Sequence, residues 1–428
     1  SASAASYNDL TDKDQIVNKD AVSMLVSLGI IEGKPDGSYA PTENVDRAQM
    51  AKMLSVIMNK GVDNSALYQS VNSGLTDITS NWAKGHINYC YTTGIIAGRG
   101  NGTFDPSATV TALEAAKMLL VAVGYDPKIE GFEGADWAIN VSVRADEQGI
   151  FEGFTKDLSA PLNRDDAALL IYNALDVEMI QSYTTNNYPI AYSDHRTILA
   201  DKYGVIKVQG VVVANEWASL ASDDGDAALK EGKTTIYNGE GIFSTTGNTT
   251  VSKEDASLKT QTFNVSTPVD MLGKTVNLYI KKTTILADST VYGDPVVSDV
   301  NTVVTTGETV LYSGAKDPQV DYDKLLGENG LTDKDAKYFW NYNSGKYIPN
   351  TTEKYGDKTA NVKGATLTII DNNGDGEVDY VLSVEKALAD ITSVNSKKET
   401  VTVRTLGTLD NKDVVGYEDM AKEDVVLY

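Results

Sequence analysis

The sequence predicts a multidomain α + β protein, in which a helix-dominated N-terminal part precedes all-β domains of barrel or sandwich type. Two observations predict this class. A five-residue passage occurs three times in the first 180 residues, and the composition shifts to Thr, Val, Asn and Gly after Asp201. A chain of 428 residues is long enough for two or three domains.

The repeated passage reads Gly-Ile-Ile-x-Gly, with Phe for the second Ile in the third copy. It lies at 29–33, 94–98 and 149–153, so the steps are 65 residues (94 − 29) and 55 residues (149 − 94). Repeats at such a period are typical of architectures built from one small supersecondary unit. A proline downstream of each copy keeps both steps: Pro41, Pro106 and Pro161.

Each copy is predicted to fold as helix, loop, helix. In copy two, Gly94 ends the first helix as a C-terminal glycine does. Thr111 and Glu114 are placed as N-cap and N3 of a capping box that opens the second helix. Because one such unit cannot bury its apolar face alone, the three copies should pack on each other. The other copies place the same cap pairs at Asp46 with Gln49 and at Asn163 with Asp166.

These landmarks resemble the S-layer homology (SLH) domain of bacterial surface proteins, over roughly residues 7–180. Copy two carries most of the family pattern, in Asp77, Trp82-Ala83, the glycine passage and Gly102–Pro106. The resemblance implies a pseudo-threefold bundle of three SLH repeats. The expected segments are repeats at 1–65, 66–125 and 126–182, a linker at 183–200, a β-rich assembly or spacer domain at 201–388, and a further β unit at 389–428.

The resemblance also implies a binding site. Grooves between SLH repeats hold a secondary cell-wall polysaccharide that is often pyruvylated and therefore anionic, and an Arg that opens the second helix is the usual anion contact. A helix N-terminus favours anions, and an arginine adds bidentate donors for a carboxylate. The candidate polysaccharide-binding residues are Asp9, Arg47, Asp77, Trp82, Gly98, Trp137 and Arg164.

The three copies are unequal at these positions. Arg47 and Arg164 are kept, whereas copy two has Ala112; the Trp is present as Trp82 and Trp137 and absent from copy one. If each groove pairs an Arg with the Trp of the next copy, only Arg47 with Trp82 is complete. If the pairing lies within one copy, only Arg164 with Trp137 is complete. We expect one groove, the Arg47–Trp82 one, to dominate binding; the alternative for both Trp residues is plain packing.

Composition limits the partners. A net charge of −23 argues against nucleic acid, which requires a basic surface. One cysteine, Cys90, excludes an internal disulfide, and no run of 18 apolar residues predicts a membrane span. The small, polar start Ser1–Ser6 is typical of a chain cut by signal peptidase, so we expect a mature, exported protein of the cell wall or S-layer.

After the linker, β-branched and aromatic stretches predict strands. The expected strands lie at 205–214, 234–237, 262–265, 275–280, 303–312, 365–370, 378–384 and 400–404, with helices at 322–326 and 333–338. The segment after Ile391 looks like a new hairpin, and we expect the β unit that it starts to be truncated at Tyr428.

One loop in the β part has the oxygen spacing of a calcium loop. Its ligands would come from loop positions 1, 3, 5, 7 and 9, with Gly at position 6. Position 12 is Leu382, so the bidentate carboxylate is missing, and a plain hairpin turn accounts for the pattern equally well. Any Ca²⁺ affinity should be weak, roughly 10⁻⁴–10⁻³ M. The candidate ligands are Asp371, Asn373, Asp375, Glu377 and Asp379.

Only two histidines, His86 and His195, are present, and nothing marks a catalytic group. We therefore expect no enzyme activity. The predicted function is non-covalent anchoring of a surface-layer protein to a wall polysaccharide, with self-association into a lattice. The alternative is a wall-anchored enzyme or adhesin whose effector domain lies beyond residue 428.

Overall fold

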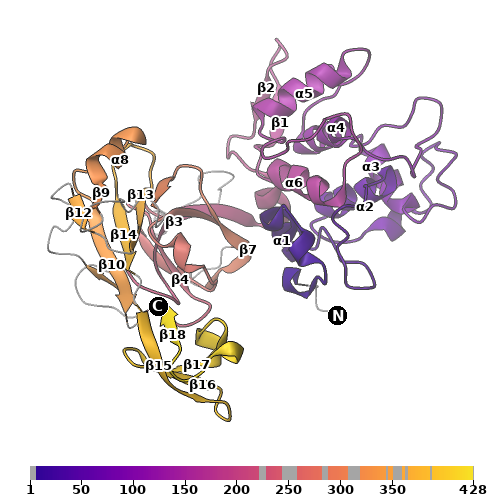
Figure 1. Ribbon diagram of the computed structural model, residues 1–428. Helices are drawn as coiled ribbons and strands as arrows, with labels where there is room; N and C mark the ends of the chain where they lie inside the picture. The colour runs from indigo at the N-terminus through magenta and orange to yellow at the C-terminus, as the bar shows by residue number, and fades with distance from the viewer. Residues whose placement is uncertain are drawn as a thin grey trace. The chain divides into compact units, whose positions relative to one another are not determined.

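The computed structural model describes residues 6–220, 228–242, 258–281, 288–306, 319–343, 346–349, 359–361, 365–385 and 388–427. The chain forms two compact units. The first contains residues 1–210, 232–267 and 276–297, and the second contains 211–231, 268–275 and 298–428. Helices dominate the N-terminal region and strands follow, as the sequence predicted (Figure 1). In the described residues, no helix has both the length and the apolar character needed to cross a membrane.

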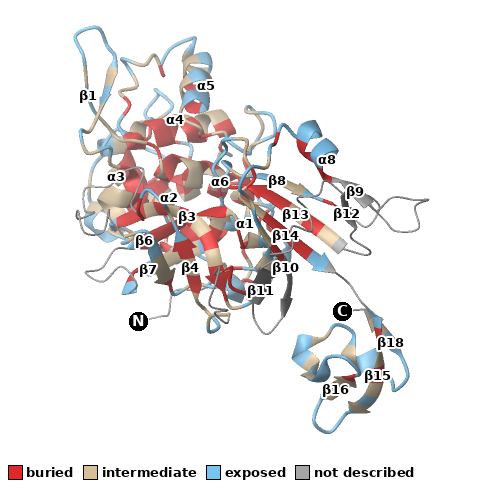
Figure 2. Cartoon of the chain, turned by 90° about the vertical axis from the view of Figure 1, so that its left-hand side faces the viewer, coloured by how far each residue is buried: buried red, intermediate tan, exposed pale blue. Residues whose placement is uncertain are grey.

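Six α-helices form the helical part of the first unit. The second helix of each copy packs on the first helix of another copy. These pairs are α2 with α3, α4 with α5, and α6 with α1. Their inward faces form one large buried core (Figure 2). The helices are α1 (Lys19–Ser27), α2 (Arg47–Met58), α3 (Lys84–Thr92), α4 (Ala112–Val123), α5 (Trp137–Glu147) and α6 (Arg164–Leu175).

A ring of three backbone hydrogen bonds joins the copies just before their second helices. The Val45 N–H donates to the Leu162 carbonyl at 2.8 Å, Leu162 donates to Val110 at 2.7 Å, and Val110 donates to Val45 at 2.9 Å. Each second helix then begins with the predicted N-cap, whose side chain accepts the N3 N–H. These caps are Asp46, Thr111 and Asn163.

The structure corrects the third proline landmark. The carbonyls of Pro41 and Pro106 accept the N2 N–H of the second helix of another copy, from Asp165 at 3.1 Å and Ala48 at 3.0 Å. In copy three the carbonyl in this place is that of Leu158, which accepts from Leu113 at 3.0 Å, and not that of Pro161. The loop of copy three is therefore three residues shorter, five residues from Gly153 to Leu158 against eight from Gly98 to Pro106.

The rest of the first unit is mainly a sheet in the order β5-β4-β3-β6-β7, whose β3 continues into the second unit. Strand β7 packs against α1, and Gly293 lies so close to Met24 that an added Cβ would be 3.3 Å from the Met24 Cα. Where the sequence predicted a linker, the chain forms a hairpin. The strands are β1 (Ile180–Tyr183), β2 (Pro189–Ala191), β3 (Val205–Asn215), β4 (Thr234–Tyr237), β5 (Thr260–Phe263), β6 (Thr275–Lys281) and β7 (Thr290–Val297).

The second unit contains a sheet in the order β11-β10-β14-β13-β8 and a pair β12-β9. Helix α8 (Tyr322–Glu328) confirms the helix expected at 322–326, but the helix expected at 333–338 is wrong, because β10 begins at Lys337. The expected strand 303–312 corresponds in part to β8, and residues 307–312 lie outside the described ones. The strands are β8 (Thr302–Thr305), β9 (Gln319–Asp321), β10 (Lys337–Asn343), β11 (Lys346–Pro349), β12 (Thr359–Asn361), β13 (Ala365–Asp371) and β14 (Tyr380–Glu385).

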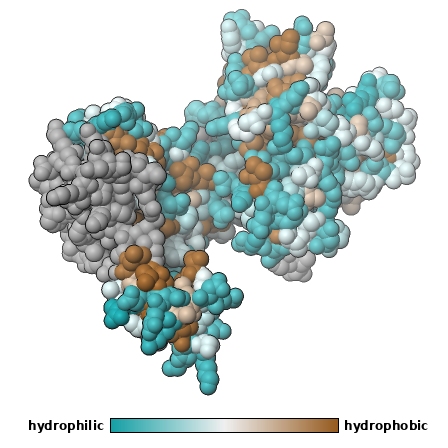
Figure 3. Space-filling model, in the orientation of Figure 1, coloured by the Kyte–Doolittle hydropathy of each residue, from teal (hydrophilic) through white to brown (hydrophobic). Residues whose placement is uncertain are grey.

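A small four-stranded sheet, β17-β16-β15-β18, ends the chain. Its core is Ala389, Ile391, Val401 and Val403, and hydrophobic residues also reach its surface (Figure 3). The strands are β15 (Leu388–Asn395), β16 (Thr400–Val403), β17 (Gly407–Asp410) and β18 (Val425–Leu427).

Candidate polysaccharide-binding grooves

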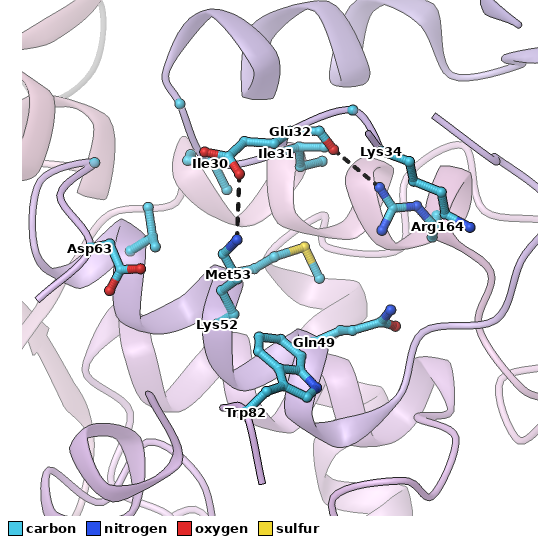
Figure 4. Close-up of a pocket in the computed structure, with 14 residues that line it drawn as sticks. Ile30, Ile31, Glu32, Lys34, Gln49, Lys52, Met53, Asp63, Trp82 and Arg164 are labelled. Atoms are coloured by element: carbon cyan, nitrogen blue, oxygen red, sulfur yellow. Dashed lines mark hydrogen bonds and ion pairs between the residues drawn. The ribbon is translucent and has the colours of Figure 1, made fainter. Parts of the chain in front are cut away.

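Two grooves lie between the copies. The first, a cavity of about 360 Å³, has the passage 29–33 and α2 of copy one on its walls. Trp82 of copy two closes one side and Arg164 of copy three lies at the other (Figure 4). This groove thus draws residues from all three copies. The polar and aromatic lining residues are Glu32, Lys34, Gln49, Lys52, Asp63, Trp82 and Arg164.

The second groove, about 610 Å³, repeats this plan one copy further along. Its walls are the passage of copy two, which includes Gly98, and α4; Trp137 comes from copy three and Arg47 from copy one. The predicted pairings are therefore wrong, since Arg47 shares a groove with Trp137 and Arg164 with Trp82. The charged and aromatic lining residues are Arg47, Arg99, Glu114, Lys117, Glu133 and Trp137.

Arg47 joins copy one to copy two. Its Nε donates to the Phe104 carbonyl at 2.9 Å, and its Nη2 donates to the Ala97 carbonyl at 2.7 Å. The guanidinium lies 4.4 Å from the centre of the Phe104 ring. The side chain is buried, and this burial lowers the pKa of Arg47 to about 10. Arg47 is therefore a structural link first, with its remaining donors at the groove wall.

Arg164 makes the equivalent link from copy three to copy one. Its Nε donates to the Tyr39 carbonyl at 2.7 Å, and its Nη2 reaches the Glu32 carbonyl at 3.4 Å. The guanidinium lies 4.8 Å from the Tyr39 ring centre, and the Tyr39 hydroxyl donates back to the Arg164 carbonyl at 2.7 Å. The side chain is more exposed than that of Arg47, so more of it is available to a ligand.

The third interface, between copies two and three, lacks this pair. Ala112 replaces the arginine, and Lys156, two residues before Leu158, replaces the aromatic residue. Lys156 forms an ion pair with Asp166 of its own copy. Val17, which takes the place of the Trp on the side of copy one, is 82% exposed. The arginine and its aromatic partner are thus either both present or both absent.

The early aspartate of copies one and two holds a loop, whereas copy three has Phe132 at this position. Asp77 accepts the N–H groups of Phe104 at 2.9 Å and Asp105 at 2.7 Å. Burial is the largest single effect on the pKa of Asp77 and raises it, but the backbone hydrogen bonds together outweigh burial, so the pKa is lowered. In copy one the same task falls to Asp12, which accepts from Tyr39 and Ala40. Asp9 is therefore not the equivalent of Asp77 in copy one. It accepts the Ser6 N–H in a local capping box.

Both grooves are richer in cations than the chain as a whole. Each has three cationic and two acidic lining residues, whereas the whole chain has 37 basic and 60 acidic residues. Trp82 is 58% exposed, and the Lys117 Nζ lies 5.8 Å from the Trp137 ring centre. Lys52 forms a 3.5 Å ion pair with Glu32. Sequence reasoning missed Lys52 and Lys117, although they keep the 65-residue step (117 − 52).

A buried polar pair stands behind the first groove. Ser55 Oγ and His86 Nδ1 are 2.5 Å apart, and His86 Nε2 lies 3.6 Å from the Asp63 carboxylate. The contact between Ser55 and His86 joins α2 to α3. Both side chains are buried and are therefore shielded from a ligand in the groove. Burial lowers the pKa of His86, although Asp63 opposes this effect. The second groove has Leu120 and Val141 at the equivalent positions.

The candidate calcium loop is the turn between β13 and β14. Asp371 accepts N–H groups from Asn373 at 3.1 Å, Gly374 at 2.8 Å and Gly376 at 2.9 Å. Burial, followed by the neighbouring carboxylates, raises the pKa of Asp379. Glu377 forms an ion pair with Lys334, and across the described residues no group of three or more His, Cys, Asp or Glu is arranged to hold a metal. These contacts account for the turn chemistry, and the calcium site stays a prediction.

The S-layer homology domain family model matches residues 6–51 and 74–116. A cell surface protein of Thermoanaerobacter kivui is 27% identical over 243 residues, 56% of this chain and 29% of that protein. An S-layer protein of Bacillus licheniformis is 33% identical over 113 residues, 26% of this chain and 12% of its own length. An amylopullulanase of Thermoanaerobacterium thermosulfurigenes is 30% identical over 185 residues, 40% of this chain and 9% of the enzyme.

The chain therefore contains S-layer homology domain sequence in the segments 6–51 and 74–116, which belong to copies one and two. It spans less than a third of the length of each of these relatives.

Proposed function

We propose that the helical part is one pseudo-threefold bundle of three SLH repeats that anchors the protein to the cell wall by binding an anionic polysaccharide in the two grooves. The protein would be extracellular and structural, and its β-rich part would space or assemble a surface layer. The observation that carries the proposal is the repetition in two grooves of one set of groups: a Trp, a Lys and an Arg around a glycine passage.

The chemistry of these groups suits an acidic sugar. An exposed Trp face offers apolar area to a sugar ring, and its polar edge tolerates water. Lys117 brings a positive charge beside the Trp137 face, and Lys52 lines the same groove as Trp82, so a carboxylate substituent would be favourable in both grooves. The large negative charge of the whole chain does not oppose this binding, because charges beyond roughly 8–10 Å are screened at physiological salt.

The test uses groove residues that are not structural links. Trp82→Ala with Lys52→Gln disables the first groove, and Trp137→Ala with Lys117→Gln disables the second. Trp217→Ala is the control, because Trp217 is 51% exposed and lines neither groove. We expect each double variant to weaken binding of purified wall polysaccharide and the four-residue variant to abolish it. Wild-type affinity in the four-residue variant would overturn the proposal.

A second candidate function is the anchoring of an attached enzyme to the cell wall. The amylopullulanase relative supports it, although the match covers only a small part of that enzyme's length. An SLH segment of this kind is thus compatible with an attached enzyme. Hydrolase assays on the protein as produced by its host, together with electron microscopy of the envelope, separate the two functions, because a surface layer gives a two-dimensional lattice and an anchored enzyme does not.

A further inference from the structure

Three lysines from distant parts of the first unit line one pocket of about 380 Å³. Lys60 follows α2, Lys202 lies in the single helical turn η4 (Leu199–Tyr203), and Lys281 ends β6. We call this the lysine pocket. Its remaining lining residues are Ser27, Leu28, Gly61, Tyr203 and Tyr292, so none of the described residues that line it is acidic.

The charge in the lysine pocket is largely uncompensated. Among the described residues, neither Lys60 nor Lys281 has an ion pair. Lys202 pairs with Asp201 at 3.0 Å, but Asp201 also accepts from Arg196 at 3.3 Å. A cation just beyond a helix C-terminus is favourable by itself, which accounts for Lys60 after α2. It does not account for Lys202 and Lys281, which come from other elements.

The lysine pocket adjoins the first groove. Gly61 lines both, and Leu28 in the pocket is followed directly by Gly29 in the groove. Gly61 has a φ of +79°, and a Cβ there would lie 3.1 Å from the Leu28 carbonyl and 3.2 Å from the Tyr203 ring. A glycine at this position therefore keeps the boundary between the two cavities narrow and free of a side chain. The Tyr203 hydroxyl is buried here without a hydrogen-bond partner in the described structure.

We propose that the lysine pocket is a subsite that binds an acidic group, a carboxylate or a phosphate, of the same polysaccharide that occupies the first groove. This inference rests on the proposed function. It adds residues from outside the SLH repeats to the binding surface, and it makes the first groove longer and more selective for anionic polymer than the second.

The experiment compares wild type with the variant in which Lys60, Lys202 and Lys281 are changed to Gln. A control variant changes the exposed Lys397, Lys412 and Lys422 to Gln, which alters the net charge equally. The probes are purified wall polysaccharide, the same polymer after esterification of its carboxylates, and the same polymer stripped of phosphate. Circular dichroism melting confirms that each variant is folded.

We expect the pocket variant to bind native polymer roughly tenfold more weakly than wild type, as the loss of three partly exposed ion pairs predicts, and the control to bind normally. One of the two treated polymers should bind wild type and pocket variant equally, which identifies the acidic group. Equal binding of native polymer by both proteins overturns the inference and leaves the proposed function intact. No binding by wild type itself overturns the proposed function, and the subsite with it.

Discussion

Replacing Arg47 with Ala tests whether this arginine is first a structural link between copies. Two hydrogen bonds from a charged donor contribute about 1.5–3 kcal/mol each, and the contact with the Phe104 ring adds about 0.5–2 kcal/mol. Burial is the largest opposing effect, and together with the charge of Arg99 it lowers the pKa of Arg47 to about 10, which corresponds to roughly 3 kcal/mol against the charged form. The net loss on removing Arg47 should therefore be about 2 kcal/mol.

Urea unfolding measures this loss. The four Trp residues include Trp82 and Trp137 in the helical part, so Trp217→Phe with Trp340→Phe leaves fluorescence that reports on that part alone. With a slope of about 2 kcal/mol per molar urea, the midpoint should fall by about 1 M. Arg164→Ala should cost less, because Arg164 is more exposed and one of its two bonds is 3.4 Å long. An unchanged midpoint for Arg47→Ala, or a larger loss for Arg164→Ala, would refute the reasoning.

Three other predictions concern the described fold. Gly124→Ala should lower the melting temperature by several degrees, because φ is +117° and a Cβ would lie 2.4 Å from the Ile180 carbonyl. Burial lowers the pKa of His86, so the unfolded chain takes up a proton first, and stability should be full above about pH 6.5 and fall as the pH drops below that value. Melting curves at several pH values should show a weaker dependence for His86→Gln than for His195→Gln, and equal dependences would contradict this. Calorimetry should show weak calcium binding, roughly 10⁻⁴–10⁻³ M, that Asp371→Asn removes, and the absence of calcium heat in the wild type would exclude the site.

The repeat predicted the helices of the helical part and their N-caps, because these features depend on residues close together in the sequence. The N-caps Asp46, Thr111 and Asn163 depend on neighbouring backbone, and all three form. The capping box is complete at Asp46 and Thr111, but in copy three the Asp166 side chain forms an ion pair with Lys156 instead. The groove partners were not predictable from spacing, because an arginine at N1 crosses to another copy and its direction depends on tertiary packing. One error was avoidable. The caps step by 52 residues from Thr111 to Asn163, which conflicts with the 55-residue step that placed Pro161.

The third interface offers a test of whether the arginine and the ring depend on each other. Ala112 and Lys156 stand where the other interfaces have an arginine and an aromatic residue. Ala112→Arg alone should destabilise the helical part, because the new guanidinium would face the Lys156 ammonium without a ring to lie against. Lys156→Phe alone loses the ion pair with Asp166.

Together the two substitutions should restore the link seen at Arg47 and Phe104. Their combined effect on urea unfolding should therefore be more favourable than the sum of the single effects by about 1 kcal/mol or more, within the usual range for residues in contact. Additive effects would mean that the arginine and the ring are independent features of the repeat. A favourable coupling would mean that the arginine and the ring act as one structural unit, which this interface lacks together with the residues that line the other two grooves.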